Sequence, residues 1–325
     1  MFSVIQSAPM EGVTRSVFRA AHWAQFDGVD TYFTPFLAPT ADMMFSEKEI
    51  REVRPQVNGG APTVPQLLTA RPEHFLWAAR DMKALGYTQI DLNLGCPSGT
   101  VVAKHKGAGM LADADTLDRF LHEIFNGLAG ENLQISVKTR IGLEDSDSFP
   151  RLMEVFNRYP MCQLAIHPRL RRQFYKGKPD LEVFAAGLAS AVMPVCYNGD
   201  IFTAEDARAL KERFPAVERL MLGRGLVANP ALAREIRGGA PLTGAELRKF
   251  HDAVLDGYCA CIIGDVNVLH KMKELWSYWA CLYPEQKKGI KAVLKSRSLA
   301  DYRAAARLVL SEEPLKNGGF DPAML

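Results

Sequence analysis

The sequence contains no apolar run long enough to cross a bilayer, because polar or charged residues interrupt every hydrophobic segment of its 325 residues. Its first residues, MFSVIQSAPMEGV, lack the basic segment and the long apolar stretch of a secretory signal peptide. There is no internal repeat and no low-complexity tract, which excludes a solenoid. These absences predict a cytoplasmic protein without a membrane partner, and nothing in the chain indicates an obligatory protein partner.

Cysteine is also scarce, and no two cysteines form a CxxC pair. The six cysteines are Cys96, Cys162, Cys196, Cys259, Cys261 and Cys281. Their spacing fits neither a disulfide framework nor a zinc site, so we expect reduced thiols and no metal. Cys96 differs from the other five because it stands between a glycine and a proline where an apolar strand ends.

Charge is modest and nearly balanced. The formal net charge is +2, with 48% hydrophobic and 23% charged residues, as in ordinary globular proteins. Basic residues nevertheless gather in two segments, RLRRQFYKGK (169–178) and KKGIKAVLKSR (287–297). Either segment alone is typical of a solvated face, and together they form a candidate phosphate-contacting surface.

Short apolar runs alternate with amphipathic segments, which predicts an α/β protein with a parallel sheet. Strands are expected at 3–8, 30–35, 62–67, 89–94, 134–139, 162–167, 192–197 and 218–222. Eight strands suit a (β/α)8 TIM barrel, although a doubly wound sheet needs the same alternation. Polar residues at the ends of the predicted strands favour the barrel, where such ends converge on one face.

The pattern changes after GGAPLTG (238–244), and helical spacing of apolar residues continues from there. We therefore predict a barrel over residues 1–240 and a small helical bundle over residues 241–325. Within the barrel, Asp113 is expected to cap the helix that follows it. Thr203 and Asp206 predict a capping box at the start of another helix.

Two late strand ends carry a candidate phosphate site. Asn198, Gly199 and Asp200 follow one strand, and Gly223 and Arg224 follow the next. Glycine-exposed N–H groups and an arginine at consecutive late strands are typical of phosphate sites in barrels.

A flavin ring also needs hydrogen-bond partners at its pyrimidine edge and a cation near N1. Gln66 and Lys138, each at a predicted strand end, suit these roles, and His167 ends a further strand.

Cys96 at the barrel rim has no partner base in its own segment, which argues against Cys–His nucleophilic catalysis. A neutral thiol with an ordinary pKa near 8.5 stays protonated at neutral pH and can act as a general acid. Lys104, His105 and Lys106 follow in the next loop. They either lower this pKa or contact an anionic substrate, and the sequence leaves both open.

Taken in order, APMEGV, DLNLGCPS, SVKTRIG, the histidine at 167, NGDI and LGRG closely resemble the tRNA-dihydrouridine synthases. The resemblance extends over almost the whole chain, and KMKELWSYW in the tail resembles that family's RNA-binding helical domain. GCPS in its setting is the most specific element. The chain departs from the family pattern at Pro35, Val102 and Pro168.

The resemblance implies an FMN enzyme that uses NADPH to reduce the C5–C6 double bond of a uridine in tRNA. Cys96 would protonate C5. The residues implied for FMN are Pro9, Met10, Gln66, Lys138, His167, Asn198, Asp200, Gly223 and Arg224. Asn93 and Arg140 would meet the uracil. The tail residues expected to hold RNA phosphates include Lys271, Lys273 and Lys291.

Two alternatives remain at this stage. A flavin barrel of the dihydroorotate or dihydropyrimidine dehydrogenase kind would share the phosphate site but act on free pyrimidines. A non-catalytic RNA-binding barrel would bind tRNA without flavin. The basic helical tail argues against the first, and the cysteine, the lysine and the phosphate residues together argue against the second.

Overall fold

The computed structural model describes residues 1–314 and residue 320. Its parallel strands form one sheet in the order β3-β2-β1-β9-β8-β7-β6-β5-β4. The strands are β1 (Val4–Ser7), β2 (Thr31–Phe33), β3 (Thr63–Val64), β4 (Gln66–Leu67), β5 (Gln89–Leu94), β6 (Gln134–Arg140), β7 (Gln163–His167), β8 (Val195–Tyr197) and β9 (Arg219–Leu222).

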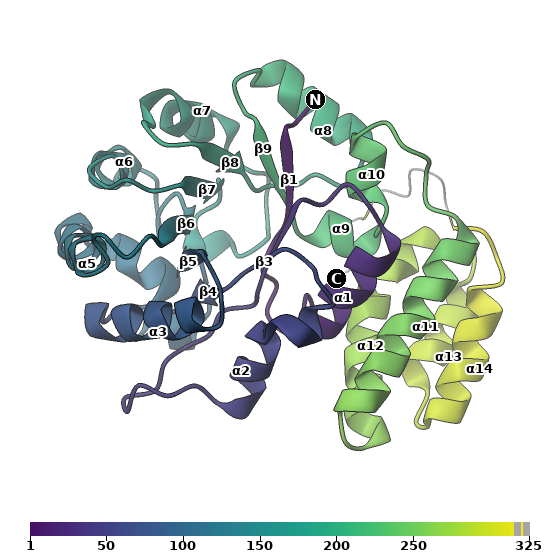
Figure 1. Ribbon diagram of the computed structural model, residues 1–325. Helices are drawn as coiled ribbons and strands as arrows, with labels where there is room; N and C mark the ends of the chain where they lie inside the picture. The colour runs from purple at the N-terminus through teal and green to yellow at the C-terminus, as the bar shows by residue number, and fades with distance from the viewer. Residues whose placement is uncertain (315–319, 321–325) are drawn as a thin grey trace.

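The predicted strand 62–67 is divided in two at Pro65, because proline has no N–H to donate to a neighbouring strand. Its first half, β3, pairs with β2, and its second half, β4, pairs with β5. The two halves therefore complete a ring of eight strand positions, and the predicted α/β TIM barrel is confirmed (Figure 1).

Helices surround the sheet. Those of the barrel are α1 (Ser16–Gln25), α2 (Glu47–Val53), α3 (Pro72–Ala84), α4 (Gly99–Val102), α5 (Ala114–Gly127), α6 (Phe149–Phe156), α7 (Leu181–Ser190), α8 (Ala204–Arg213), α9 (Arg224–Ala228) and α10 (Leu232–Ile236). Both predicted caps are confirmed. The Asp113 carboxylate accepts from the backbone N–H of Asp115, and Thr203 and Asp206 form the reciprocal bonds of a capping box.

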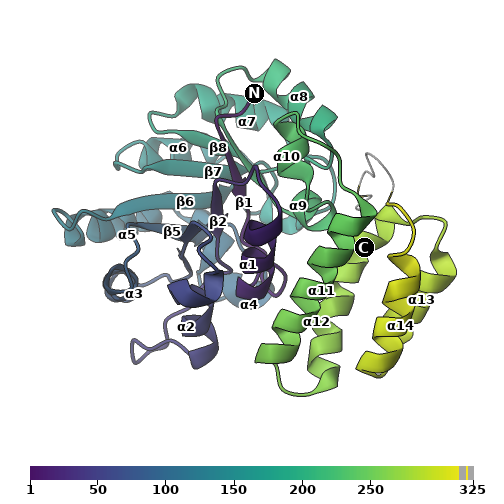
Figure 2. The same cartoon turned by 45° about the vertical axis from the view of Figure 1, so that its right-hand side comes forward.

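The chain then forms α11 (Gly244–Cys261), α12 (Asp265–Trp279), α13 (Lys287–Lys295) and α14 (Leu299–Val309), which lie together at one side of the barrel (Figure 2). Their apolar core is continuous with Phe18 and Phe26 of the α1 segment. The Trp279 indole donates to the Val227 carbonyl at the end of α9, at 2.9 Å. The helices are thus anchored to the barrel flank beside the α9 loop.

The domain boundary near residue 240 stays a prediction, since the helical segment shares this core with α1 and α9. Of the predicted helical domain, residues 315–319 and 321–325 lie outside the described part. Within residues 1–314 and residue 320, no helix is both long and apolar enough to cross a membrane.

Candidate active site

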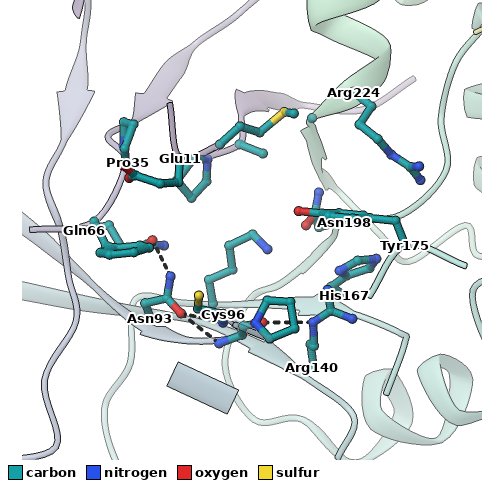
Figure 3. Close-up of a pocket in the computed structure, with 18 of the residues that line it drawn as sticks. Glu11, Pro35, Gln66, Asn93, Cys96, Arg140, His167, Tyr175, Asn198 and Arg224 are labelled. Atoms are coloured by element: carbon teal, nitrogen blue, oxygen red, sulfur yellow. Dashed lines mark hydrogen bonds between the residues drawn. The ribbon is translucent and has the colours of Figure 1, made fainter. Parts of the chain in front are cut away.

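A cavity opens at the carboxyl ends of the barrel strands, with an open volume of about 850 Å³. Thirteen of the residues predicted from the sequence line it: Pro9, Met10, Gln66, Asn93, Cys96, Lys138, Arg140, His167, Asn198, Gly199, Asp200, Gly223 and Arg224. Gln66, Asn93 and Cys96 lie along one side, and Asn198 and Arg224 along the opposite side (Figure 3). The barrel therefore brings together strand ends that are far apart in the sequence.

Other lining residues were not predicted as site residues. They are Ala8, Glu11, Pro35, Phe36, Gly95, Pro97, Tyr175 and Phe202. Glu11 stands inside the APMEGV motif, and Tyr175 stands inside the basic segment 169–178. Because that segment was interpreted only for its charge, the aromatic residue was missed, although its position after β7, the sixth of the eight barrel positions, was a usable signal.

Cys96 lies half-buried at the rim, just beyond the end of β5. Burial raises the pKa of its thiol above the ordinary value, and this outweighs the lowering by a Ser98 backbone hydrogen bond and by Arg140. The neighbouring Glu11 carboxylate raises it further. At neutral pH the side chain is therefore a protonated thiol, which suits a proton donor rather than a nucleophile.

Asn93 holds the loop that carries this thiol. Its Oδ1 accepts hydrogen bonds from the backbone N–H groups of Gly95 and Cys96, at 3.0 and 2.9 Å. Its Nδ2 donates to Gln66 Oε1 at 2.7 Å (Figure 3). The second hydrogen on Nδ2 stays available to a ligand in the cavity.

Lys138 extends from β6 into the same space. No acceptor within the described part of the chain is in hydrogen-bond contact with its Nζ. Burial and then the nearby Arg140 lower the pKa of this ammonium to about 8. An anionic or electron-rich ligand atom at this position would restore the lost solvation.

His167 at the end of β7 has a pKa well below its ordinary value, because of burial and of the surrounding Arg140, Lys138, Arg169 and Arg224. Its imidazole is therefore neutral.

Two arginines meet at Asp200. Arg169 Nη1 and Arg224 Nη2 both donate to Asp200 Oδ1, at 2.9 and 2.7 Å, and Arg169 Nη2 donates to Oδ2. Arg169 is only 1% exposed, so it is not part of an RNA-facing surface, unlike the expectation for the segment 169–178. Arg224 also lines the cavity.

Arg140 connects two loops of the rim. Its Nε donates to the Gly95 carbonyl at 2.9 Å, and its Nη1 and Nη2 donate to the carbonyls of Leu170 and Phe174 at 2.9 and 2.8 Å. The guanidinium thus joins the Cys96 loop to the loop that carries Tyr175. The centroid of the Tyr175 ring lies 4.9 Å from the guanidinium carbon of Arg224. Both residues lie on the side of the cavity opposite Gln66 (Figure 3).

The donor set fits a flavin phosphate and ring. A Cβ on Gly199 would lie 2.1 Å from the Tyr197 hydroxyl, and one on Gly225 would lie 2.1 Å from the Ile201 carbonyl. The second contact joins the two late loops, so only glycine at position 225 allows them to approach this closely. Arg224 provides a cation beside these loops, while Lys138, Gln66 and Asn198 provide donors and a cation deeper in the cavity.

The three tail lysines lie outside this cavity. Lys271 Nζ donates to the Gly12 carbonyl at 3.1 Å and to Glu274 at 2.9 Å, and Lys273 Nζ donates to the Ser296 carbonyl at 2.6 Å. Both line a second groove between α2 and α12. Lys291 is exposed on α13. Their contact with RNA stays a prediction.

Comparison with known proteins gives a consistent result. Residues 6–260 match the dihydrouridine synthase family. The tRNA-dihydrouridine(16) synthase of Pseudomonas syringae pv. tomato is 30% identical over 75% of this chain and 80% of its own. The enzyme of the same name from Neisseria meningitidis is 26% identical over 82% of each chain. A probable tRNA-dihydrouridine synthase of Staphylococcus aureus is 29% identical over 77% of each.

Among solved structures, the old yellow enzyme homologue from Zymomonas mobilis superposes with a TM-score of 0.53 and 13% identity, over 76% of this chain and 92% of that one. Histamine dehydrogenase from Rhizobium sp. 4-9 gives the same TM-score with 12% identity, over 79% of this chain and 48% of that one. These likenesses confirm the barrel.

The match to the dihydrouridine synthase family supports an enzyme of the oxidoreductase class. The chain belongs to the dihydrouridine synthase family.

Proposed function

We propose that the protein is a cytoplasmic tRNA-dihydrouridine synthase, with FMN as cofactor and NADPH as electron donor. The observation that supports this most is the thiol of Cys96. It is kept protonated at the rim of a cavity that Lys138 and Arg224 also line. Both the Pseudomonas and the Neisseria relatives are named tRNA-dihydrouridine(16) synthase, so position 16 is the first uridine to map.

We propose that FMN would be held by residues that line the cavity. Arg224 and the glycine loops at Gly199 and Gly223 would hold its phosphate, and Asp200 would keep Arg224 and Arg169 in place. Lys138 and Gln66 would bind the ring, with Pro9 and Met10 packed against it and His167 as a neutral partner. Asn198 would contact the ribityl and phosphate end. When bound, FMN would supply the hydride that C6 of the uracil accepts.

The protein's own part in the reaction is the proton. Cys96 Sγ–H would donate to C5 of the uracil as C6 is reduced, and the resulting thiolate would be stabilised by the nearby Arg140 and Lys138 cations. Solvent then returns the proton to sulfur. Asn93, through its free Nδ2 hydrogen, and Arg140, through its unused N–H groups, would bind the uracil carbonyl oxygens.

The target base must leave its stack to reach this cavity, so a loop nucleotide is a less costly target than a paired one. A groove lined by Phe174, Tyr175, Lys176 and, on α12, Glu274 and Tyr278 leads to Cys96. Exposed aromatic rings there can stack on bases, and the basic residues of the tail, residues 241–325, would hold phosphates.

The test uses purified protein. Denaturation should release FMN, identified by mass, and incubation with NADPH and unmodified tRNA should add two hydrogens to a uridine. Free uridine and dihydroorotate serve as competing substrates. Reduction of free uridine or oxidation of dihydroorotate, without reduction of tRNA, would contradict the proposal, as would tRNA binding by a protein that carries no flavin.

A further inference from the structure

A buried carboxylate lies beneath the cavity, on the strand that leads to Cys96. Asp91 is in the middle of β5 and is 0% exposed. It does not line the cavity, and the proposed reaction has no step for it. A fully buried acid on a barrel strand requires donors to offset its desolvation, and here each carboxylate oxygen has one.

The two donors come from the neighbouring strands. Gln66 Nε2 on β4 donates to Asp91 Oδ2 at 2.7 Å, and Ser136 Oγ on β6 donates to Oδ1 at 2.6 Å. Strand pairing places Gln66 and Ser136 directly beside Asp91. The Asp91 carboxylate is thus in contact with a residue that does line the cavity.

From Gln66 the hydrogen bonds continue to the thiol loop. Gln66 Oε1 accepts from Asn93 Nδ2 at 2.7 Å, and Asn93 Oδ1 accepts from the N–H groups of Gly95 and Cys96. This series of hydrogen bonds begins at the Asp91 carboxylate, which only accepts, and ends at two peptide N–H groups, which only donate. Only one orientation of the two amides between them satisfies every bond.

We propose that Asp91 is a positioning residue for the reaction: through Gln66 and Asn93 it fixes the direction of both cavity amides and the place of the Cys96 loop. It also ensures that the second hydrogen of each amide nitrogen, rather than an oxygen, remains for a ligand. The assignment of roles to flavin and uracil rests on the proposed function, whereas the hold on the Cys96 loop does not.

Substitutions distinguish this positioning role from one in which Asp91 only completes the hydrogen bonds of its buried neighbours. Asp91→Ala removes the acceptor of Gln66 Nε2. Asp91→Asn keeps an oxygen for Gln66, because Ser136 Oγ can accept from the new amide N–H. Ser136→Ala is the matched control, since it removes the other hydrogen bond to the same carboxylate and leaves the chain to Cys96 intact.

The first readout is the rate at which iodoacetamide alkylates Cys96. It is followed by mass spectrometry of the tryptic peptide 84–104, which contains no other cysteine, in the full-length protein after removal of flavin. We expect Asp91→Ala to raise this rate about threefold or more, since the freed loop exposes a half-buried thiol. Asp91→Asn should restore most of the wild-type rate, and Ser136→Ala should stay within about twofold of it.

The second readout is turnover with tRNA, where Asp91→Ala should lower kcat about tenfold or more with a smaller change in KM. If Asp91→Ala does not fold, Gln66→Met breaks the same chain and should raise Cys96 alkylation equally. Unchanged alkylation in a folded Asp91→Ala or Gln66→Met protein would overturn the proposal, as would equal effects of Asp91→Ala and Ser136→Ala. Because alkylation requires neither flavin nor tRNA, its outcome is independent of whether the proposed function holds.

Discussion

The carboxylate of Asp200 offers a quantitative test of how the Arg224 side of the cavity is held. Asp200→Asn keeps the shape of the side chain but replaces a charge that two guanidinium groups share. Arg169 would keep only neutral partners, His167 Nε2 at 3.1 Å and the Gly177 carbonyl at 2.6 Å. The substitution therefore leaves a buried cation without a counter-charge.

Removing one partner of a buried ion pair costs about 3–5 kcal/mol. Asp200 is 22% exposed whereas Arg169 is 1% exposed, so water solvates part of the pair and the lower end, about 3 kcal/mol, applies. At roughly 2 °C per kcal/mol for a chain of this size, the melting temperature should fall by about 6 °C.

The assay is thermal and denaturant unfolding of the full-length protein with flavin removed. Glu182→Gln is the matched control, because it removes the same charge from an exposed pair with Arg213, in which the side chains are 85% and 44% exposed. It should change stability by no more than about 0.5 kcal/mol. Equal losses in the two variants, or a loss below about 1 kcal/mol for Asp200→Asn, would refute the reasoning.

Three further predictions follow from the described contacts. Lys291→Ala should weaken tRNA binding a few-fold without loss of flavin, and it should lower the slope of log affinity against log salt concentration by about one. Titrations at several salt concentrations measure both effects. An unchanged slope would show that this lysine does not contact RNA. The single-turnover rate of uridine reduction should stay flat through neutral pH and fall at alkaline pH, as the Lys138 ammonium, with its pKa lowered to about 8, and then the Cys96 thiol, with its raised pKa, lose their protons. A fall below pH 7 would contradict the raised pKa of the Cys96 thiol. His22 is fully buried between the Tyr32 hydroxyl and the Pro230 carbonyl, and burial lowers its pKa to about 4. Its contribution to stability should therefore be lost as pH falls from about 6.5 toward 4. His22→Gln should reduce the dependence of the unfolding free energy on pH over that range. An unchanged dependence would mean that the imidazole is already charged in the folded protein.

Much of the fold could be predicted because a parallel barrel is specified by local patterns. Alternating apolar strands and amphipathic helices mark its units, and the strand 89–94 was predicted with its observed bounds. The interruption at Pro65 could be predicted from the missing N–H of proline. That the two halves pair with different neighbours, β3 with β2 and β4 with β5, could not be predicted from the sequence. The packing of the tail against α1 and α9 depends on contacts that no local pattern specifies.

In the candidate site, too, local patterns predict which residues gather but not which of them contact one another. Residues at strand ends could be placed together because parallel strands share one carboxyl edge. Which charges pair could not be predicted, since Arg169 and Asp200 meet only through the arrangement of the β7 and β8 loops. The polarity of the Asp91–Gln66–Asn93 chain likewise depends on strand register, which places three side chains from β4 and β5 within hydrogen-bond reach.

The central claim is that Cys96 supplies the proton to C5 of a uridine in tRNA. The most direct measurement is the dihydrouridine content, by mass spectrometry, of unmodified tRNA incubated with NADPH and either the wild-type protein or Cys96→Ala, with flavin content matched. The account predicts that the wild-type protein adds two hydrogens to a uridine and that the variant, still carrying flavin, loses at least about 100-fold in rate. Equal rates for the two proteins would contradict it.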